Sequence, residues 1–241
     1  MKKLIIAFIS IVSVLIAGAA TAEARRLNDK IENRPYADMR RWHLGFSVGM
    51  NTMDTRFAHN GFVTENGEEW RAEQVNYQPG FTVTGLASLR LNNYLSLRFS
   101  PGMMFGSRDI RFLELNSGAE ESQNIKSTYV TLPLDLKFAA MRTRNARPYI
   151  FGGVMPAFDV SKKRNDILKL TSTDFYLSVG IGCDFYLPYF KLIPELRFSF
   201  GLSDILTHDR PELADDPTRL KFTSSIAKAT SKMISLVFYF E

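Results

Sequence analysis

The sequence predicts an all-β fold, an eight-stranded antiparallel β-barrel that spans an outer membrane. Three observations lead to it. Apolar and polar residues alternate with a period of two along most of the chain after residue 41. The connections between the expected strands are alternately short and long, which is typical of short periplasmic turns and long extracellular loops. After the first residues, no apolar run approaches the roughly 20 residues that a spanning helix needs.

The chain begins with an expected export signal over residues 1–22. Two lysines and an apolar run up to Ala17 are followed by small residues, which is the layout of a secretory signal peptide. The small residues up to Ala22 predict cleavage there, with cleavage after Ala24 as the alternative. An uncleaved membrane anchor is disfavoured because the apolar run is short.

Residues 23–41 are expected to form a polar, basic periplasmic arm, and residues 42–241 the barrel. After residue 24 the arm holds six basic residues against three acidic ones and shows no apolar periodicity. We therefore expect an exposed tail and not a second domain.

The first four expected strands have one face that is almost entirely apolar. Polar residues such as Thr82, Ser96 and Asp135 occupy the other face. The apolar faces are Leu44, Phe46, Val48 and Met50 in residues 42–53; Phe81, Val83, Ala87, Leu89 and Leu91 in 80–92; Leu97, Phe99 and Met103 in 94–105; Val130, Leu132, Leu134, Leu136 and Phe138 in 128–139.

The last four strands follow the same rule, except that residues 147–158 are less clear because Tyr149-Ile150-Phe151 is apolar on both faces. The glycines of Gly180-Ile181-Gly182 and Gly152-Gly153 are expected to relieve crowding between inward side chains or to mark bulges. The apolar faces are Phe175, Leu177, Val179, Ile181, Cys183 and Phe185 in 174–187; Leu192, Leu196, Phe198 and Phe200 in 190–202; Ile234, Leu236, Phe238 and Phe240 in 229–240.

The connections fall into two groups. Asn92-Asn93, residues 141–146 and Pro188-Tyr189 are short, and Asn92-Asn93 is a tight-turn signal. The long, polar connections are residues 54–79, 106–127, 159–173 and 203–228.

Alternation alone leaves two barrels open, a soluble lipocalin-like barrel with the apolar face inside and a membrane barrel with that face in lipid. The polar faces are poor in Lys and Glu and rich in Gly, Ser and Thr, which suits a narrow interior. Aromatic residues also gather near the strand ends, as at the two surfaces of a membrane. Both observations favour the membrane barrel.

Seven charged residues lie on the polar strand faces, and unpaired they would be costly. We expect an interior network of ion pairs that closes the lumen; a proton- or ion-conducting path is the disfavoured alternative. The seven residues are Arg90, Arg98, Asp135, Lys137, Asp184, Glu195 and Arg197.

A second candidate site is the expected periplasmic turn that holds Arg142, Arg144 and Arg147. Such a basic rim can dock an acidic partner or anionic lipid headgroups. An ordinary solvated turn is an equally good interpretation.

The sequence offers little for catalysis or cofactors, and no small-molecule substrate is evident. The single Cys183 excludes a disulfide framework within the chain and any multi-cysteine metal site. His43, His59 and His208 are far apart, and His59 and His208 fall in expected outer loops. We therefore expect no enzyme, no metal and no cofactor. A formal charge of +5, scattered along the chain, does not favour nucleic acid.

Several stretches together resemble the PorT/SprT family of Bacteroidetes outer-membrane barrels over roughly residues 42–241. Their order and spacing carry the resemblance. They are His43-Leu-Gly-Phe-Ser-Val-Gly-Met-Asn51, Leu132-Pro-Leu-Asp-Leu-Lys-Phe138, Arg147-Pro-Tyr-Ile-Phe-Gly-Gly153 and Leu192-Ile-Pro-Glu-Leu-Arg-Phe-Ser-Phe-Gly-Leu-Ser-Asp-Ile-Leu206.

The resemblance implies a component of the type IX secretion system, which exports cargo with C-terminal sorting domains and in some members serves gliding motility. It implies action by protein contacts and no catalytic residues. The expected partners are outer-membrane lipid and secretion proteins at the periplasmic rim. Two alternatives stay open: a surface barrel for adhesion or small-solute passage, and a lipid A-modifying enzyme.

Overall fold

The computed structural model describes residues 33–59, 61, 69–115, 118–161, 171–207 and 225–241. The expected export signal and the first part of the expected arm lie outside these residues. The described part holds a short 3-10 helix, η1 (Ala37–Met39), and eleven β-strands. None of its helices is long and apolar enough to cross a membrane.

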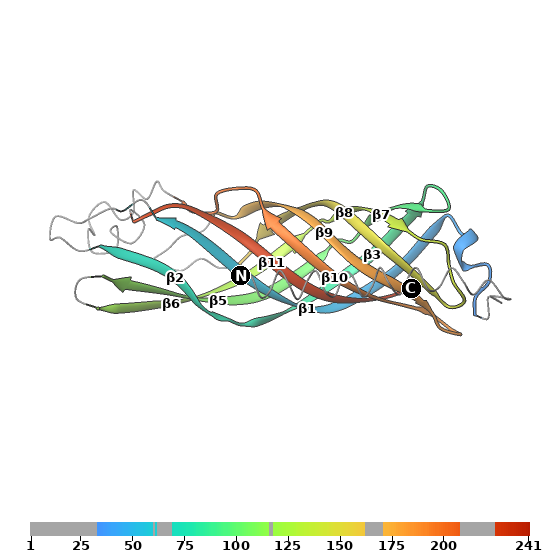
Figure 1. The fold of residues 1–241 in the computed structure, drawn as a ribbon, viewed down its shortest axis with the longest axis horizontal. Coiled ribbons are helices and arrows are strands. Elements are labelled where there is room, and N and C mark those ends of the chain that lie inside the picture. The colour runs from blue at the N-terminus through green and yellow to red at the C-terminus, as the bar shows by residue number, and fades with distance from the viewer. Residues whose placement is uncertain (1–32, 60, 62–68, 116–117, 162–170, 208–224) are drawn as a thin grey trace, which may run out of the picture.

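All strand pairs are antiparallel, and they close into a barrel that is elongated in Figure 1. The ring runs β8-β7-β4-β3-β1-β11-β10-β9 and closes because β9 also pairs with β8. The strands are β1 (Trp42–His59), β2 (Trp70–Tyr77), β3 (Pro79–Arg90), β4 (Leu95–Phe99), β5 (Gly102–Glu114), β6 (Glu120–Thr131), β7 (Leu134–Ala139), β8 (Ala146–Asp159), β9 (Thr173–Tyr186), β10 (Lys191–Gly201) and β11 (Ile226–Phe240).

The eleven strands correspond to eight passes along the barrel wall, because three passes are broken. β2 and β3 are separated by Gln78, β4 and β5 by Ser100-Pro101, and β6 and β7 by Leu132-Pro133. The expectation of eight unbroken strands is corrected in this respect. Each break contains or adjoins a proline, which has no N–H to give to the ladder. The segments on the two sides of a break pair with the same neighbour, as β6 and β7 both do with β8.

The strands also continue further to the extracellular side than the sequence predicts. Residues 54–79 and 106–127 were expected to be loops, but β1 runs to His59 and most of both segments is strand. Figure 1 shows β2, β5 and β6 extending at one end of the barrel. In the outer part of this extension most inward residues are apolar, such as Ile110 and Phe112, while Arg111 between them is exposed. The alternation therefore continues, but here the apolar residues lie on the inward face. A prediction that follows outward apolar residues ends before this extension, so the expected strands were too short.

Over the rest of the wall, the outward residues are mainly apolar, and most of the polar residues point inward. Leu44 is 73% exposed and Ile150 is 57% exposed, whereas Ser47, Thr131 and Ser235 are buried in the interior. A soluble barrel would have the opposite arrangement. The lipid-facing assignment of the apolar faces therefore holds.

Three hydrophobic clusters follow one another along the interior, and we name them by their position. The periplasmic layer is Leu86, Ala139, Tyr149, Phe151, Ile193, Val237 and Tyr239. The middle layer is Met53, Met104, Tyr129, Met155, Ala157, Tyr176 and Met233. The outer layer is Trp70, Ala72, Ile110, Phe112, Ile125, Ile205, Leu206, Ile226 and Ala229.

Candidate functional site

Four of the expected interior charges form one compact network near the periplasmic layer. Strand register places Arg98 of β4 opposite Asp135 of β7, and Glu195 and Arg197 share a face of β10. Arg98 lies 2.5 Å from Glu195 and 3.5 Å from Asp135, while Arg197 lies 2.6 Å from Asp135 and 3.0 Å from Glu195 (side-chain N to O). Two guanidinium groups thus alternate with two carboxylates, and the cluster is formally neutral.

Aromatic side chains enclose this network. The Phe151 ring centroid lies 5.0 Å from the Arg98 guanidinium carbon and 4.6 Å from that of Arg197. The Tyr149 hydroxyl donates a hydrogen bond of 2.7 Å to Glu195. These contacts combine ion pairing with cation–π attraction in a site that water does not reach.

Glycines on β9 make room for the two aromatic rings. A Cβ atom on Gly180 would lie 2.6 Å from Cε1 of Phe151, and one on Gly182 would overlap the Tyr149 ring. The expectation that glycines relieve crowding of inward side chains is confirmed for Gly180 and Gly182, but it is wrong for Gly152, where a Cβ would have its nearest neighbour at 3.9 Å. The aromatic partners on β8 were not predicted, because that strand is apolar on both faces.

Lys137 and Asp184 form a separate pair closer to the periplasmic rim. The Lys137 amino group lies 2.6 Å from a carboxylate oxygen of Asp184 and 3.8 Å from the Tyr149 ring centroid. Arg90 lies apart from both groups, because it ends β3 at the rim and donates a hydrogen bond to the backbone carbonyl of Asp38. Arg90 was expected in the interior network, and the structure places it against the arm instead.

The three rim arginines are not one free basic patch. Arg142 is stacked 3.5 Å from the Tyr186 ring centroid and donates hydrogen bonds to the backbone carbonyls of Asn33 and Arg34 in the arm. Arg147 lies 3.4 Å from Asp38. Arg144 is exposed and has a positive φ of 53°. Arg142 and Arg147 therefore hold the arm to the barrel.

Asp38 is the centre of this arm contact. Its carboxylate lies 3.5 Å from Arg142 and 3.4 Å from Arg147, and it accepts a hydrogen bond of 2.5 Å from the Tyr186 hydroxyl. Arg34, also in the arm, donates to the backbone carbonyl of Glu241 at 3.0 Å. Residues 33–41 thus pack under the barrel, whereas the sequence predicted an exposed tail.

Glu241 forms a second anchor at the same end. Its carboxylate lies 2.6 Å from His43 of β1 and 2.6 Å from Lys191 of β10. Burial raises the pKa of this carboxyl, but the hydrogen bond from His43 and the charge of Lys191 outweigh it and bring the pKa down to about 2. Glu241 is therefore an ionised tie between the first and the last strands of the barrel.

A further buried charge, Arg108 of β5, was missed because its position fell in an expected loop. Its guanidinium donates to the hydroxyls of Tyr129 at 2.7 Å, Thr55 at 2.8 Å and Ser127 at 3.2 Å. Arg108 is 1% exposed and lies at the level of the middle layer. Continuing the alternation past Phe105 would have placed it on the inward face.

Between the network and the middle layer the interior leaves little space. A cavity of about 10 Å³ is lined by Ser100, Thr131 and Arg197 among others, which is about the volume of one water position. Side chains therefore fill this part of the lumen.

The histidines do not meet in the described part of the chain. His59 Nε2 accepts a hydrogen bond of 3.0 Å from the backbone N–H of Ala72, and His43 contacts Glu241. His208 lies outside the described residues. Cys183 is half-buried on the outward face of β9.

A closed antiparallel barrel with a charged interior and an apolar outer wall defines the class of outer-membrane β-barrel proteins. Residues 25–207 match the family model described as "Outer membrane protein beta-barrel domain". The chain belongs to this family, and its place is the outer membrane.

Solved structures add distant similarities. The outer membrane protein OprG from Pseudomonas aeruginosa is 14% identical with a TM-score of 0.43, over 83% of this chain and 93% of that one. The N-terminal barrel domain of P. aeruginosa OprF is 12% identical with a TM-score of 0.35, over 80% of this chain and 97% of that one. The protein Ail of Yersinia pestis, solved with a heparin analogue, is 13% identical with a TM-score of 0.35, over 84% of this chain and 100% of that one. No curated protein matches the chain.

Proposed function

We propose that this outer-membrane barrel is a component of the type IX secretion system, needed for export of cargo with C-terminal sorting domains. It acts by protein contacts and not by catalysis. The export signal over residues 1–22 belongs to this proposal, since secretion across the inner membrane must precede insertion.

The observation that carries the contact mechanism is the filled interior. Arg98, Arg197, Asp135 and Glu195 neutralise one another, and aromatic rings pack around them. A barrel whose lumen is closed by buried ion pairs offers its partners only its two ends and its outer wall. The resemblance to the PorT/SprT barrels narrows this contact role to type IX secretion.

The periplasmic end is the proposed docking surface. Arg142 and Arg147 fix the arm, and Arg144 stands exposed beside them in the same turn. Arm and turn thus form one ordered, basic platform that suits an acidic face on a periplasmic partner. In this arrangement Arg142 and Arg147 order the platform, and Arg144 adds a further exposed positive charge to it.

The test is export of sorting-domain cargo after deletion of the gene, with a complemented strain as control. We expect cargo to accumulate in the periplasm and to return to the surface and medium on complementation. Unchanged export would refute the secretion role.

Point variants then separate the platform from the barrel. Arg144→Glu is expected to reduce export with normal barrel insertion, whereas Arg56→Glu, which reverses an exposed charge at the extracellular end of β1, leaves export intact. Equal export in the two strains would refute the docking role of the rim.

The second candidate is a surface barrel for adhesion or small-solute passage. The extracellular extension of β2, β5 and β6, with its polar outer face, favours adhesion over passage. Binding of the protein to host or partner cells without any export defect would support it. A lipid A-modifying activity would require loss of that activity in His59→Ala or His208→Ala.

A further inference from the structure

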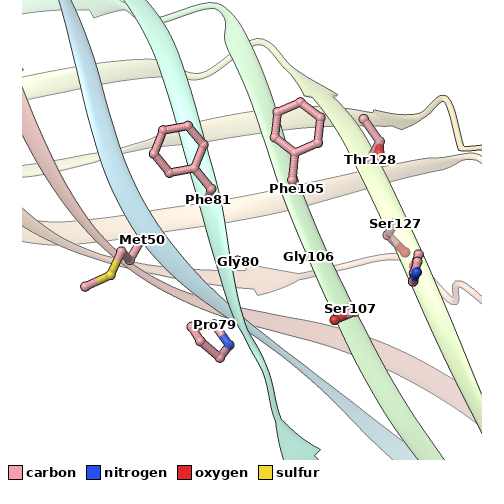
Figure 2. Close-up of a pocket in the computed structure, with 10 residues that line it drawn as sticks. Met50, Pro79, Gly80, Phe81, Phe105, Gly106, Ser107, Ser127 and Thr128 are labelled. Carbon is pink, nitrogen blue, oxygen red and sulfur yellow. The ribbon is translucent and has the colours of Figure 1, made fainter.

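The outer wall has a hollow at the level where its outward residues change from apolar to polar. It has a volume of about 590 Å³ and is shown in Figure 2. On the membrane side it is bounded by Met50 of β1, Phe81 of β3 and Phe105 of β5, which are 59%, 49% and 41% exposed. Its residues come from four neighbouring passes of the barrel, so it is part of the folded wall and not of a loop.

The extracellular side of the hollow lacks large apolar side chains. Pro79 succeeds Phe81 on β3, Ser107 succeeds Phe105 on β5, and Lys126 succeeds Thr128 on β6. Ser107 lies directly opposite Lys126, and Phe105 opposite Thr128, in the register of β5 with β6. Figure 2 shows Phe81 and Phe105 side by side on one side of the hollow, with Pro79 and Ser107 on the other. This change of polarity marks the boundary between hydrocarbon and headgroups.

Lys126 brings a positive charge to that boundary. Asp109 of β5 accepts hydrogen bonds from Gln78 at 2.7 Å and Asn124 at 2.5 Å. Within the described part of the chain, no carboxylate lies within ion-pair distance of Lys126. Thr128, two residues further on the same face of β6, adds a hydroxyl donor.

The part of the wall on the other side of β1 is different. There Asp54 of β1 faces Lys232 of β11 in the strand register, and both line a second, smaller hollow of about 400 Å³. In that hollow a carboxylate lies opposite the lysine across the strand pair, whereas the residue opposite Lys126 is Ser107. The two hollows therefore differ in the residue that faces the lysine.

We propose that the larger hollow, between Met50 and Lys126, is a binding site for one phosphate-bearing lipid of the outer leaflet. Its acyl chain packs against Met50, Phe81 and Phe105, and its phosphate contacts the Lys126 amino group and the Thr128 hydroxyl. The site holds one lipid at a fixed place on the barrel wall. The other lipids around the barrel only solvate the wall.

The experiment measures lipid retained by the full-length protein in detergent, by native mass spectrometry. The probes are dioleoyl phosphatidylglycerol and dioleoylglycerol, which share acyl chains and differ in the anionic phosphoglycerol headgroup. We expect retention of the phosphate lipid alone. Lys126→Gln should lower its retention about fivefold, the effect of one surface lysine on an anionic lipid. Ser107→Trp, which fills the hollow, should abolish it.

The matched control is Lys228→Gln, which removes an exposed lysine from β11. It should leave retention unchanged. Equal losses in Lys126→Gln and Lys228→Gln would refute the site in favour of bulk surface charge. Equal retention of the two probes by the wild type would refute the phosphate contact, and undiminished retention by Ser107→Trp would refute the location. Heat-modifiable migration on gels shows that each variant is folded.

Discussion

Arg98 illustrates what a buried charge demands inside this barrel. Its side chain contacts Glu195 and Asp135 and lies against the Phe151 and Tyr239 rings, each 5.0 Å from its guanidinium carbon. Removing one member of such a group leaves a carboxylate unpaired in a medium that cannot solvate it. The loss of stability arises mainly from the buried carboxylate that is left unpaired, and less from the loss of the ion pair itself.

We therefore expect Arg98→Met to reduce the free energy of unfolding by about 3–5 kcal/mol. Arg111→Met, which breaks the exposed pair with Glu120, should cost about 1 kcal/mol or less. Urea unfolding of the barrel in detergent micelles, followed by tryptophan fluorescence, measures both. Similar losses in the two variants would show that the interior network is no more than a set of surface-like ion pairs.

Glu241 predicts a pH dependence of its own. Its pKa falls from an ordinary 4.5 to about 2 in the folded protein, so its contribution is complete above pH 4.5 and is lost as the pH falls towards 2. Glu241→Gln should lower the free energy of unfolding at pH 6 and approach the wild type below pH 2. The measurement is urea unfolding of both proteins across this range. A difference that does not change with pH would contradict the ionised tie.

At the scale of elements, β9 is built around the aromatic residues of its neighbour β8. In Gly180→Ala the methyl group would overlap the backbone oxygen of Leu196 and lie 2.6 Å from the Phe151 ring, whereas a Cβ on Gly152 of β8 has its nearest neighbour at 3.9 Å. We expect Gly180→Ala to destabilise the barrel by about 1–3 kcal/mol and Gly152→Ala to be neutral or stabilising by about 0.5–1 kcal/mol. Thermal unfolding of the two variants tests this; the same sign in both would contradict it.

The arm is the second element with a defined contact. Asp38 joins Arg142, Arg147 and Tyr186, so Asp38→Ala should release the arm from the rim. Trypsin should then cleave after Arg40 or Arg41 at least several times faster, with the barrel itself resistant. Asp54→Ala, on the other end of β1, is the control. Unchanged cleavage in Asp38→Ala would mean that other contacts hold the arm.

The sequence located the strands through the membrane but not their breaks or extensions. Alternation in β9 and β10 is regular, and their bounds agree with the expected ones within one residue. The break at Ser100-Pro101 contains a proline, a local signal that a prediction from the alternation of apolar and polar residues does not use. In β5 the outward residues are apolar up to Phe105 and mainly polar from there to Glu114. A prediction based on lipid-facing apolar residues therefore ends the strand at Phe105.

On the scale of the whole molecule, the candidate site too was predicted only in part. The sequence predicted which residues lie inside the barrel, but not which of them pair. Parity alone put Arg98, Asp135, Glu195 and Arg197 in the interior, since a strand has only two faces. Pairing between them depends on register across the barrel, and the arm contact of Arg142 depends on where a segment more than a hundred residues away comes to lie. Those are properties of the closed ring and not of any single strand.

Closure of the lumen is a whole-molecule property because three apolar layers and two charged levels follow one another along the barrel. Opening one layer should not open the others. We expect no conductance steps in planar bilayers for the wild type, and none for Phe151→Ala, which thins only the periplasmic layer. Steps in the wild type would support small-solute passage over the contact role. Steps in Phe151→Ala alone would show that the periplasmic layer is the seal, and that the Arg108 level above it already admits ions.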